Sequence, residues 1–286
     1  MPTSWAFRSA AAAGIVLVGS VALQNYCRRR RKALIIASRD GNLATVRALC
    51  LGSFSAIASM CGCYSILLKP EPEWAGVTAV YASALQGHAD VLRYLIQQGA
   101  PVDQANHAGD MPLHIAAQEG HNACIFELLS AGAPIDWRSP VGGASALMFA
   151  CQAGHDNSVD LLLRARADTD VLNHDGNSAL FICCEHGHVE CARWMLEAGC
   201  STELRWGEHS RAGSGATPLF IACVTGQLGC VQLLSSYGAS RHLNVPALDR
   251  LVSAEEVAEE RGHHHVVEWL RSTRASPLQI SARSHV

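Results

Sequence analysis

The 286-residue sequence predicts an all-α solenoid, in which short helix–turn–helix units stack on one another and are joined by hairpin loops. Two observations lead to this prediction: a similar stretch of about 25 residues recurs along the chain, and each copy has a glycine between two apolar segments. The spacings between these glycines are 46, 33, 34, 33, 39 and 36 residues, for Gly41, Gly87, Gly120, Gly154, Gly187, Gly226 and Gly262. Two short helices cannot bury their apolar faces alone, so the units must stack.

The unit at 110–136 shows how each element is predicted. Pro112 opens a helix, because a proline at the first helical position loses no hydrogen bond. Residues 113–117 form a short apolar helix, and Gly120 ends it, because glycine readily adopts the left-handed conformation of the turn. Apolar residues within 124–129 recur at helical spacing and predict the second helix, which Gly132 ends.

These units resemble the ankyrin repeat, which has about 33 residues and a T-P-L-H-x-A signature. The signature is matched best by Met111-Pro112-Leu113-His114-Ile115-Ala116 and Thr217-Pro218-Leu219-Phe220-Ile221-Ala222, and more weakly by Ser145-Ala146-Leu147 and Ser178-Ala179-Leu180. A Gly-His pair recurs at 87–88, 120–121, 154–155, 187–188 and 262–263. The resemblance covers roughly residues 33–271 and implies about five full repeats (about 70–240) between degenerate caps at about 33–50 and 249–271.

The sequence divides into three parts. Residues 1–32 form an apolar anchor or targeting segment with a basic flank, residues 33–271 form the repeat domain, and residues 272–286 form a flexible tail. The irregular spacings place insertions near 51–74 and 205–215. Insertions in repeat arrays map to loops on one face, which is often the binding face.

Charge separates the first part from the others. The formal net charge is −3, and residues 1–32 contribute +6, so residues 33–286 carry −9. A basic head on an acidic body indicates two different roles. The acidic body argues against a protein that coats nucleic acid with a basic surface, so no nucleic-acid partner is expected.

Residues 9–27 form an uncharged stretch of 19 residues, long enough to cross a hydrocarbon core of about 30 Å. The basic run Arg28–Lys32 follows directly and would stay on the cytosolic side by the positive-inside rule. We therefore expect an uncleaved membrane anchor with the repeats facing the cytosol, on an endomembrane or the mitochondrial outer membrane.

Other interpretations of the N-terminal half stay open. Ser20-Val21-Ala22 resembles a signal-peptide cleavage site, and the absence of acidic residues would fit a mitochondrial presequence. The segment could also be a buried or partner-binding helix. Residues Ala48–Leu68 are uncharged and could be a second span, although Asp40–Leu49 fits the turn and helix of a first repeat.

The cysteines follow the repeat register rather than a chemical motif. Nine of the twelve occupy small or apolar consensus positions, where a free cysteine acts as a small hydrophobic residue. Reduced thiols indicate a cytosolic or nuclear setting. The Cys183–His188 stretch lacks the usual ligand spacing of zinc sites, and Cys61 and Cys63 lie too close together for one. We expect no metal site, and we expect His263-His264-His265 to form a solvated turn.

The sequence has no recognisable catalytic motif. G-x-S-x-G, H-E-x-x-H, P-loop and G-x-G-x-x-G patterns are absent from it. We therefore expect no enzyme activity, no cofactor and no small-molecule substrate.

The resemblance implies instead a surface that binds other proteins, made of the hairpin tips and the exposed face of the first helices. By register, the first-helix pairs are Leu85/Gln86, Gln118/Glu119, Gln152/Ala153, Glu185/His186 and Val224/Thr225, and the hairpin tips are Trp74, His107, Asp110, Val141, His174, Asp175, Asn177 and Ser214. Trp74, Trp137 and Trp206 lie in or near the loops between repeats, and tryptophan is common at interface hot spots.

The leading hypothesis is a membrane-tethered adaptor or scaffold that faces the cytosol and binds one or more proteins. One alternative is a soluble nuclear or cytosolic regulator imported through Arg28–Lys32. Another is a substrate-recognition subunit of an enzyme complex such as a ubiquitin ligase. The C-terminal Ser284-His285-Val286 could also serve as a PDZ ligand.

Overall fold

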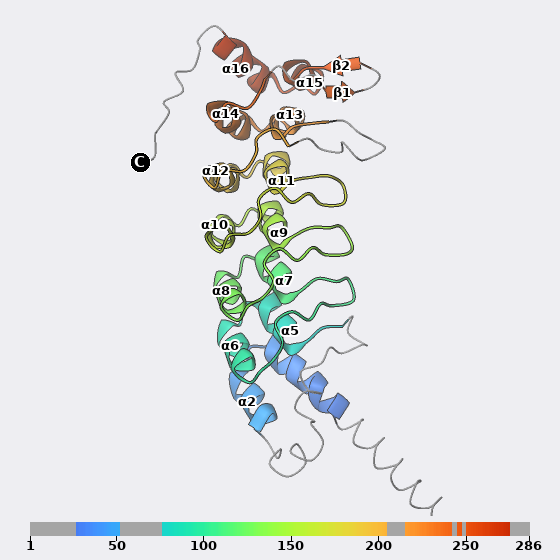
Figure 1. Cartoon of the computed structure of the whole chain (residues 1–286), viewed down its shortest axis with the longest axis vertical. Helices are drawn as coiled ribbons and strands as arrows, with labels where there is room; N and C mark the ends of the chain where they lie inside the picture. Colours follow the sequence, from blue (N-terminus) through green and yellow to red (C-terminus); the bar gives the residue numbers. More distant parts are fainter. Residues whose placement is uncertain (1–26, 52–75, 205–214, 242–244, 248–249, 275–286) are drawn as a thin grey trace, which may run out of the picture.

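The computed structural model describes residues 27–51, 76–204, 215–241, 245–247 and 250–274. Within these residues the chain forms an elongated stack of helix pairs (Figure 1). The first helices of the pairs, together called the inner row, are α5 (Ala79–Gln86), α7 (Pro112–Gln118), α9 (Ala146–Ala153), α11 (Ala179–His186), α13 (Pro218–Thr225) and α15 (Ala254–Glu260). The second helices, called the outer row, are α2 (Leu43–Leu51), α6 (Ala89–Gln97), α8 (Asn122–Ser130), α10 (Asp156–Arg164), α12 (Val189–Glu197), α14 (Leu228–Ser236) and α16 (His264–Arg274).

The connections between pairs project to one side of the stack as loops, which we call fingers (Figure 1). Finger 1 comprises residues 98–111, finger 2 residues 131–145 and finger 3 residues 165–178. Contacts run between neighbouring inner helices and between neighbouring outer helices, and this confirms the stacked repeat solenoid predicted from the glycine spacing.

An additional pair caps each end of the five regular ones. Residues 27–39 form one continuous helix that crosses the boundary expected at residue 32 and pairs with α2. In this helix Cys27 and Leu34 are buried, while Arg28 and Arg29 are exposed. The Arg30 guanidinium donates to the Leu49 carbonyl oxygen at 3.2 Å, which ties the basic run to α2. At the other end α16 continues to Arg274, three residues beyond residue 271.

The all-α prediction needs one correction. Strands β1 (Val245–Ala247) and β2 (Arg250–Val252) form an antiparallel pair before α15, with Val245 opposite Val252. Their apolar and β-branched residues favour extended backbone. A search for helical periodicity does not detect strands of three residues, and this is why the pair was missed.

Side chains fix where the inner helices begin. Thr78, Ser178 and Thr217 precede α5, α11 and α13, and each hydroxyl oxygen accepts a hydrogen bond from a backbone N–H three residues later. Ser253 and Glu256 form a reciprocal capping box at α15. Replacing such a capping residue by alanine costs about 1 kcal/mol. The N-cap residues of α7 and α9, Met111 and Ser145, form no such hydroxyl cap, so these caps fix the start of only part of the inner row.

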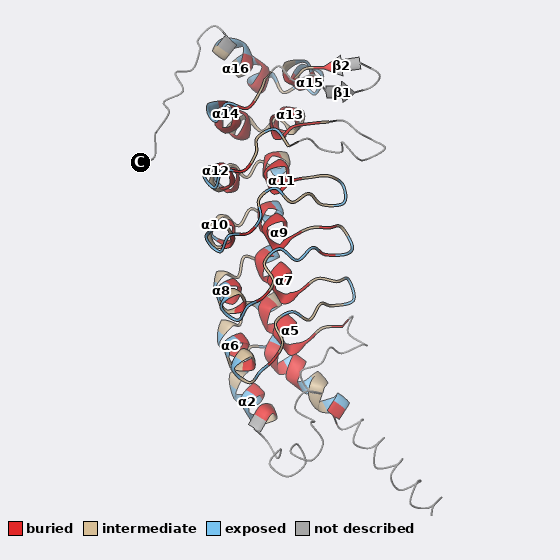
Figure 2. Ribbon diagram, in the orientation of Figure 1, coloured by how far each residue is buried: buried red, intermediate tan, exposed pale blue. Residues whose placement is uncertain are grey.

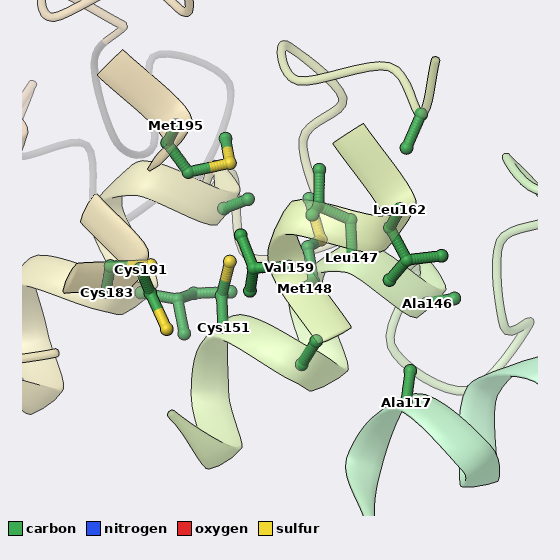
Figure 3. Packing of buried hydrophobic residues seen from close by; sticks show 14 of the residues in the cluster. Ala117, Ala146, Leu147, Met148, Cys151, Val159, Leu162, Cys183, Cys191 and Met195 are labelled. Carbon is green, nitrogen blue, oxygen red and sulfur yellow. The ribbon is translucent and has the colours of Figure 1, made fainter. Parts of the chain in front are cut away.

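The core lies where neighbouring pairs meet, and Figure 2 shows the buried residues concentrated there. Cys151, Cys183 and Cys191 lie close together, beside Val159, and Met195 lies nearby (Figure 3). All ten cysteines among the described residues are buried and free, which confirms that these thiols act as core residues. Cys61 and Cys63 lie outside the described residues.

Candidate protein-binding face

The five predicted first-helix pairs lie in the last turn of the inner helices, or directly after it. The more exposed members are Gln86, Gln118, Glu119, Gln152, Ala153 and His186, whereas Leu85, Glu185, Val224 and Thr225 are partly buried. Because successive inner helices pack side by side, these positions form a continuous row along the stack. We call this row the inner-helix ends.

Histidine side chains fix the backbone beneath this row. The Nε2 atom of His155 lies 3.0 Å from the Gln118 carbonyl oxygen of the preceding pair. Since a carbonyl oxygen can only accept, Nε2 carries the proton and donates it. The same contact recurs in His88 to Arg39, His121 to Leu85, His188 to Gln152 and His263 to Val224. We call each of these contacts a His rung.

One junction has no His rung. Gln227 occupies the equivalent position before α14, and its side chain fills the space next to Gly187 that a histidine ring fills elsewhere. Within the described residues, the Glu185 carbonyl oxygen receives no side-chain hydrogen bond from the following pair. The inner-helix end at Glu185 and His186 is therefore held less firmly than its neighbours.

The same kind of contact shows that the prediction of a solvated turn at residues 263–265 was wrong. His263 forms a His rung, and His265 lies in α16 with its Nε2 atom 3.0 Å from the Gly226 carbonyl oxygen. The sequence pattern treated three adjacent histidines as a loop, whereas two of them join the last pair to the preceding one.

Sequence reasoning missed an apolar row beside the inner-helix ends. Phe149 and Ile221 are partly exposed, and Ile115 and Ile182 retain 9% and 7% exposure. Each lies three residues before one of the predicted positions, so helical spacing places it on the same face. This three-residue helical spacing is the sequence signal that identifies the apolar row, and a prediction based on the variable pairs alone does not use it.

Two exposed histidines at the finger tips pack against the preceding connection. The His107 ring lies over Gly76, and the His174 ring lies over Gly143 of finger 2. The His174 backbone N–H also donates to the Gly142 carbonyl oxygen at 2.8 Å. These residues support the fingers while their rings stay exposed.

Finger 2 presents the most exposed apolar residue of this face. Val141 is 72% exposed at the tip of a turn that is one residue longer than those of fingers 1 and 3. Trp137 is 41% exposed, and its indole N–H donates to the Gly109 carbonyl oxygen of finger 1 at 3.2 Å. The Trp137 carbonyl oxygen in turn accepts from His114 Nε2 at 3.0 Å. Trp137 thus joins fingers 1 and 2 and still presents apolar surface.

Asp110 and Asn177 lie at the bases of fingers 1 and 3 rather than at their tips. Their backbone N–H groups donate to Asn106 Oδ1 and Asn173 Oδ1. The Oδ1 atoms of Asp110 and Asn177 are buried without a hydrogen-bond partner. Asp175 is exposed at the tip of finger 3. Leaving such a buried acceptor without a hydrogen bond costs folding free energy, because the atom has lost its water and gained no donor.

Burial makes several of the core thiols poor nucleophiles, because it raises their pKa values. It raises the pKa of Cys223 to about 12, that of Cys200 to about 12 and that of Cys124 to about 11. Burial also raises the pKa of the Tyr81 phenol, which accepts a hydrogen bond from the Asn106 side-chain amide. Burial lowers the pKa of the His114 imidazole. The ring is therefore favoured in its neutral form, which donates to the Trp137 carbonyl oxygen.

Several predicted positions lie outside the described residues. These are Trp74, Trp206, Ser214, the two insertions except their edges, and residues 9–26 of the expected anchor. The described helices include none that is both long and apolar enough to cross a membrane. The described residues also contain no group of three potential metal ligands placed to bind an ion. Of the possible second span Ala48–Leu68, residues 48–51 belong to α2, which lies against α6.

Comparison with known proteins agrees with this geometry. A family model described as ankyrin repeats (3 copies) matches residues 55–139, 113–206 and 147–245, which together cover more than half of the chain. A stretch of 70 residues is 39% identical to "Palmitoyltransferase AKR1" of Yarrowia lipolytica (strain CLIB 122 / E 150). This match covers 24% of the present chain and only 8% of the length of that protein.

Proposed function

Because this chain belongs to the ankyrin-repeat family, we propose that it is a non-enzymatic adaptor that binds another protein through the inner-helix ends and the fingers. Ankyrin repeats support a role in protein interaction. The observation that carries the proposal is the continuous row of exposed and partly exposed side chains over a backbone that His rungs fix at every junction but the one at Glu185. A rigid backbone lowers the entropy lost on binding, because the side chains are already positioned.

The proposal includes a membrane tether formed by residues 9–27, with the repeats in the cytosol on an endomembrane or the mitochondrial outer membrane. It is supported by the uncharged length of this segment and by the basic run that follows it. Arg28 and Arg29 are exposed at the start of the first described helix. A tether ending at residue 27 would therefore place these guanidinium groups beside the lipid headgroups.

The palmitoyltransferase match does not extend the proposal to catalysis. It covers 8% of that protein, so the activity in its name belongs to that protein. The non-enzymatic proposal predicts that the purified chain transfers no palmitate to an added protein thiol. Transfer above the level of a heat-denatured sample would contradict it.

The tether is tested by expressing the chain with a fluorescent C-terminal tag and extracting membranes with alkaline carbonate. The intact chain should remain in the membrane pellet, and replacing the uncharged residues 10–23 by a Gly/Ser sequence should release it. The tag should be digested by protease added outside sealed organelles. Recovery of the intact chain in the soluble fraction would contradict the tether without affecting the protein-binding proposal.

A further inference from the structure

The first described helix, residues 27–39, has a buried half and a basic half. The buried half contains Cys27, Leu34, Ile35, Ala37 and Ser38. The other half presents Arg28, Arg29, Lys32, Ile36 and Arg39, all of them exposed or partly exposed. With 3.6 residues per turn, these two sets fall on opposite sides of the helix. We call the second set the basic end face.

The basic end face lies at one end of the molecule. Figure 1 shows the helix of residues 27–39 at the N-terminal end of the stack. Because the stack buries one half of this helix, the basic end face is turned away from the repeats. The uncharged residues 9–27 run directly into the same helix in the sequence. The face therefore lies where the proposed tether would enter the array.

The charge of this end is opposite to that of the repeats. Residues 27–51 contain seven basic residues and one acidic residue, Asp40, whose carboxylate lies 2.9 Å from the Arg39 guanidinium. Residues 76–204 and 215–241 contain fifteen acidic residues, six arginines and no lysine. The described part of the chain is thus positive at its N-terminal end and negative along its repeats.

An apolar side chain lies within the basic end face. Ile36 is 39% exposed, although the neighbouring Ile35 is buried. Ile36 follows Lys32 by four residues and precedes Arg39 by three, so both cations flank it on the same face. Cations beside an exposed apolar group are typical of surfaces that bind anionic lipids, because the cations contact headgroups and the apolar group enters the acyl boundary.

We propose that the basic end face binds anionic phospholipid headgroups and holds the array end-on to the membrane. In an array lying flat, the acidic repeats would come within about 8 Å, the Debye length at physiological salt, of the same lipids and be repelled. The end-on arrangement avoids this repulsion and leaves the inner-helix ends and fingers open to protein partners. The proposal rests on the proposed function, because it adds a lipid class and an orientation to the tether.

Vesicle binding tests the lipid class. The experiment uses the chain with residues 10–23 replaced by a Gly/Ser sequence, so that the uncharged segment does not drive binding. This chain should cosediment with phosphatidylcholine vesicles containing about 30% phosphatidylserine at least about tenfold more strongly than with pure phosphatidylcholine vesicles. Raising the salt concentration from about 0.1 M to about 0.5 M should remove most of this difference, because salt screens the charges.

Charge-removing variants of the same chain test the assignment to the basic end face. A basic residue close to an anionic surface strengthens binding about fivefold, so Arg29→Gln/Arg39→Gln should weaken binding at least about tenfold. The matched control, Arg166→Gln/Arg261→Gln, removes two exposed arginines that lie elsewhere on the array. It should bind the anionic vesicles as well as the parent chain. Circular dichroism melting checks that both double variants stay folded.

A fluorescent amino acid sensitive to its environment tests the orientation. It replaces either Ile36 of the basic end face or Phe126, which is 59% exposed on the outer row. Anionic vesicles should shift the emission to shorter wavelength at position 36, because this site enters the headgroup region, and leave it unchanged at position 126.

Three results would overturn the inference: equal binding to both kinds of vesicle, equal loss of binding in the two double variants, or an equal shift at both fluorescent positions. None of these contradicts the proposed function. The tether is judged by carbonate extraction of the chain that retains residues 10–23, and the adaptor role by protein partners of the inner face. Release of that chain by carbonate would contradict the tether without changing the vesicle result.

Discussion

Two junctions of the same array differ in how the pairs are joined. At the α7–α9 junction, His155 donates to the Gln118 carbonyl oxygen at 3.0 Å, and its ring packs against Gly120. At the α11–α13 junction, Gln227 lies against Gly187, and no side-chain hydrogen bond reaches the Glu185 carbonyl oxygen from the following pair, within the described residues. The 39-residue spacing, and so the insertion near 205–215, falls at this same junction.

The comparison shows that two junctions with similar packing can differ in how strongly their helix pairs are held together. The inner helices are in extensive contact at both junctions, and buried residues continue across both. Stability in repeat arrays is approximately a sum over units and nearest-neighbour interfaces. Because one such hydrogen bond contributes about 1 kcal/mol, its absence should make the α11–α13 interface less stable than the α7–α9 interface.

The largest expected effect comes from placing a side chain on the turn glycines. Gly154 has φ of 75°, and a Cβ there would lie 2.5 Å from the His188 ring. Gly154→Ala should therefore cost about 2–4 kcal/mol, from left-handed strain and the loss of the His rung. Gly187→Ala, at φ of 80°, meets only the movable end of Gln227 and should cost about 1–2 kcal/mol. Urea unfolding measures both, and equal costs would contradict the comparison.

The next largest effect is expected from removing the side chains of His155 and Gln227, one from each junction. His155→Ala should lower the free energy of unfolding by about 1 kcal/mol, because the Gln118 carbonyl oxygen loses the hydrogen bond that joins the two pairs. Gln227→Ala should change it by less than about 0.5 kcal/mol, as is usual for surface substitutions. Thermal melts of the two variants beside the unmodified chain provide the measurement. A larger loss for Gln227→Ala would show that this glutamine joins the pairs.

Alkaline pH should weaken the junction without a His rung. Burial raises the pKa of Cys223 in α13 to about 12 from 9.0, so folding favours its protonated form. This stabilisation is complete below pH 9 and is lost as pH rises from 9 through 12. Between pH 8 and pH 10 this thiol alone should remove about 1.4 kcal/mol. Urea midpoints at both pH values test this, and Cys223→Ala should lose less stability over the same interval.

The smallest effect should be a gain. Gln227→His restores the missing His rung and should raise the free energy of unfolding by about 0.5–1 kcal/mol. Hydrogen exchange should slow in α13 and α14, while α7 and α8 exchange as before. Unchanged exchange in α13 would mean that a histidine here does not reach the Glu185 carbonyl oxygen.

The five regular helix pairs could be predicted because the residues that determine each pair lie close together in the sequence. An apolar helix, a turn glycine and a second helix recur within each unit, so one register places all five. The terminal helix pairs lack this pattern. The helix of residues 27–39 therefore begins inside the basic run, which the sequence places in the N-terminal segment. The β1–β2 pair was missed for the same reason, because its strands are too short to show a period.

The candidate site was predictable in position but not in its contacts. Repeat register places Gln118, Gln152 and Trp137 on the expected elements. It does not show that Trp137 donates to Gly109, or that the buried Asp110 oxygen lacks a partner, because these depend on how adjacent fingers stack. Phe149 and Ile221 belong to the face through helical spacing, and the sequence alone left their exposure open.

Site-specific photo-crosslinking in cells tests the central claim that the inner face binds a partner protein. A photoreactive phenylalanine analogue is placed at Gln118 or Gln152 on the inner face, or at Ala123 or Asn157 on the outer row, all of which are exposed. The account predicts that irradiation yields covalent adducts with another protein from the two inner positions and few from the two outer ones. Equal adducts from both faces, or adducts from the outer row alone, would contradict it.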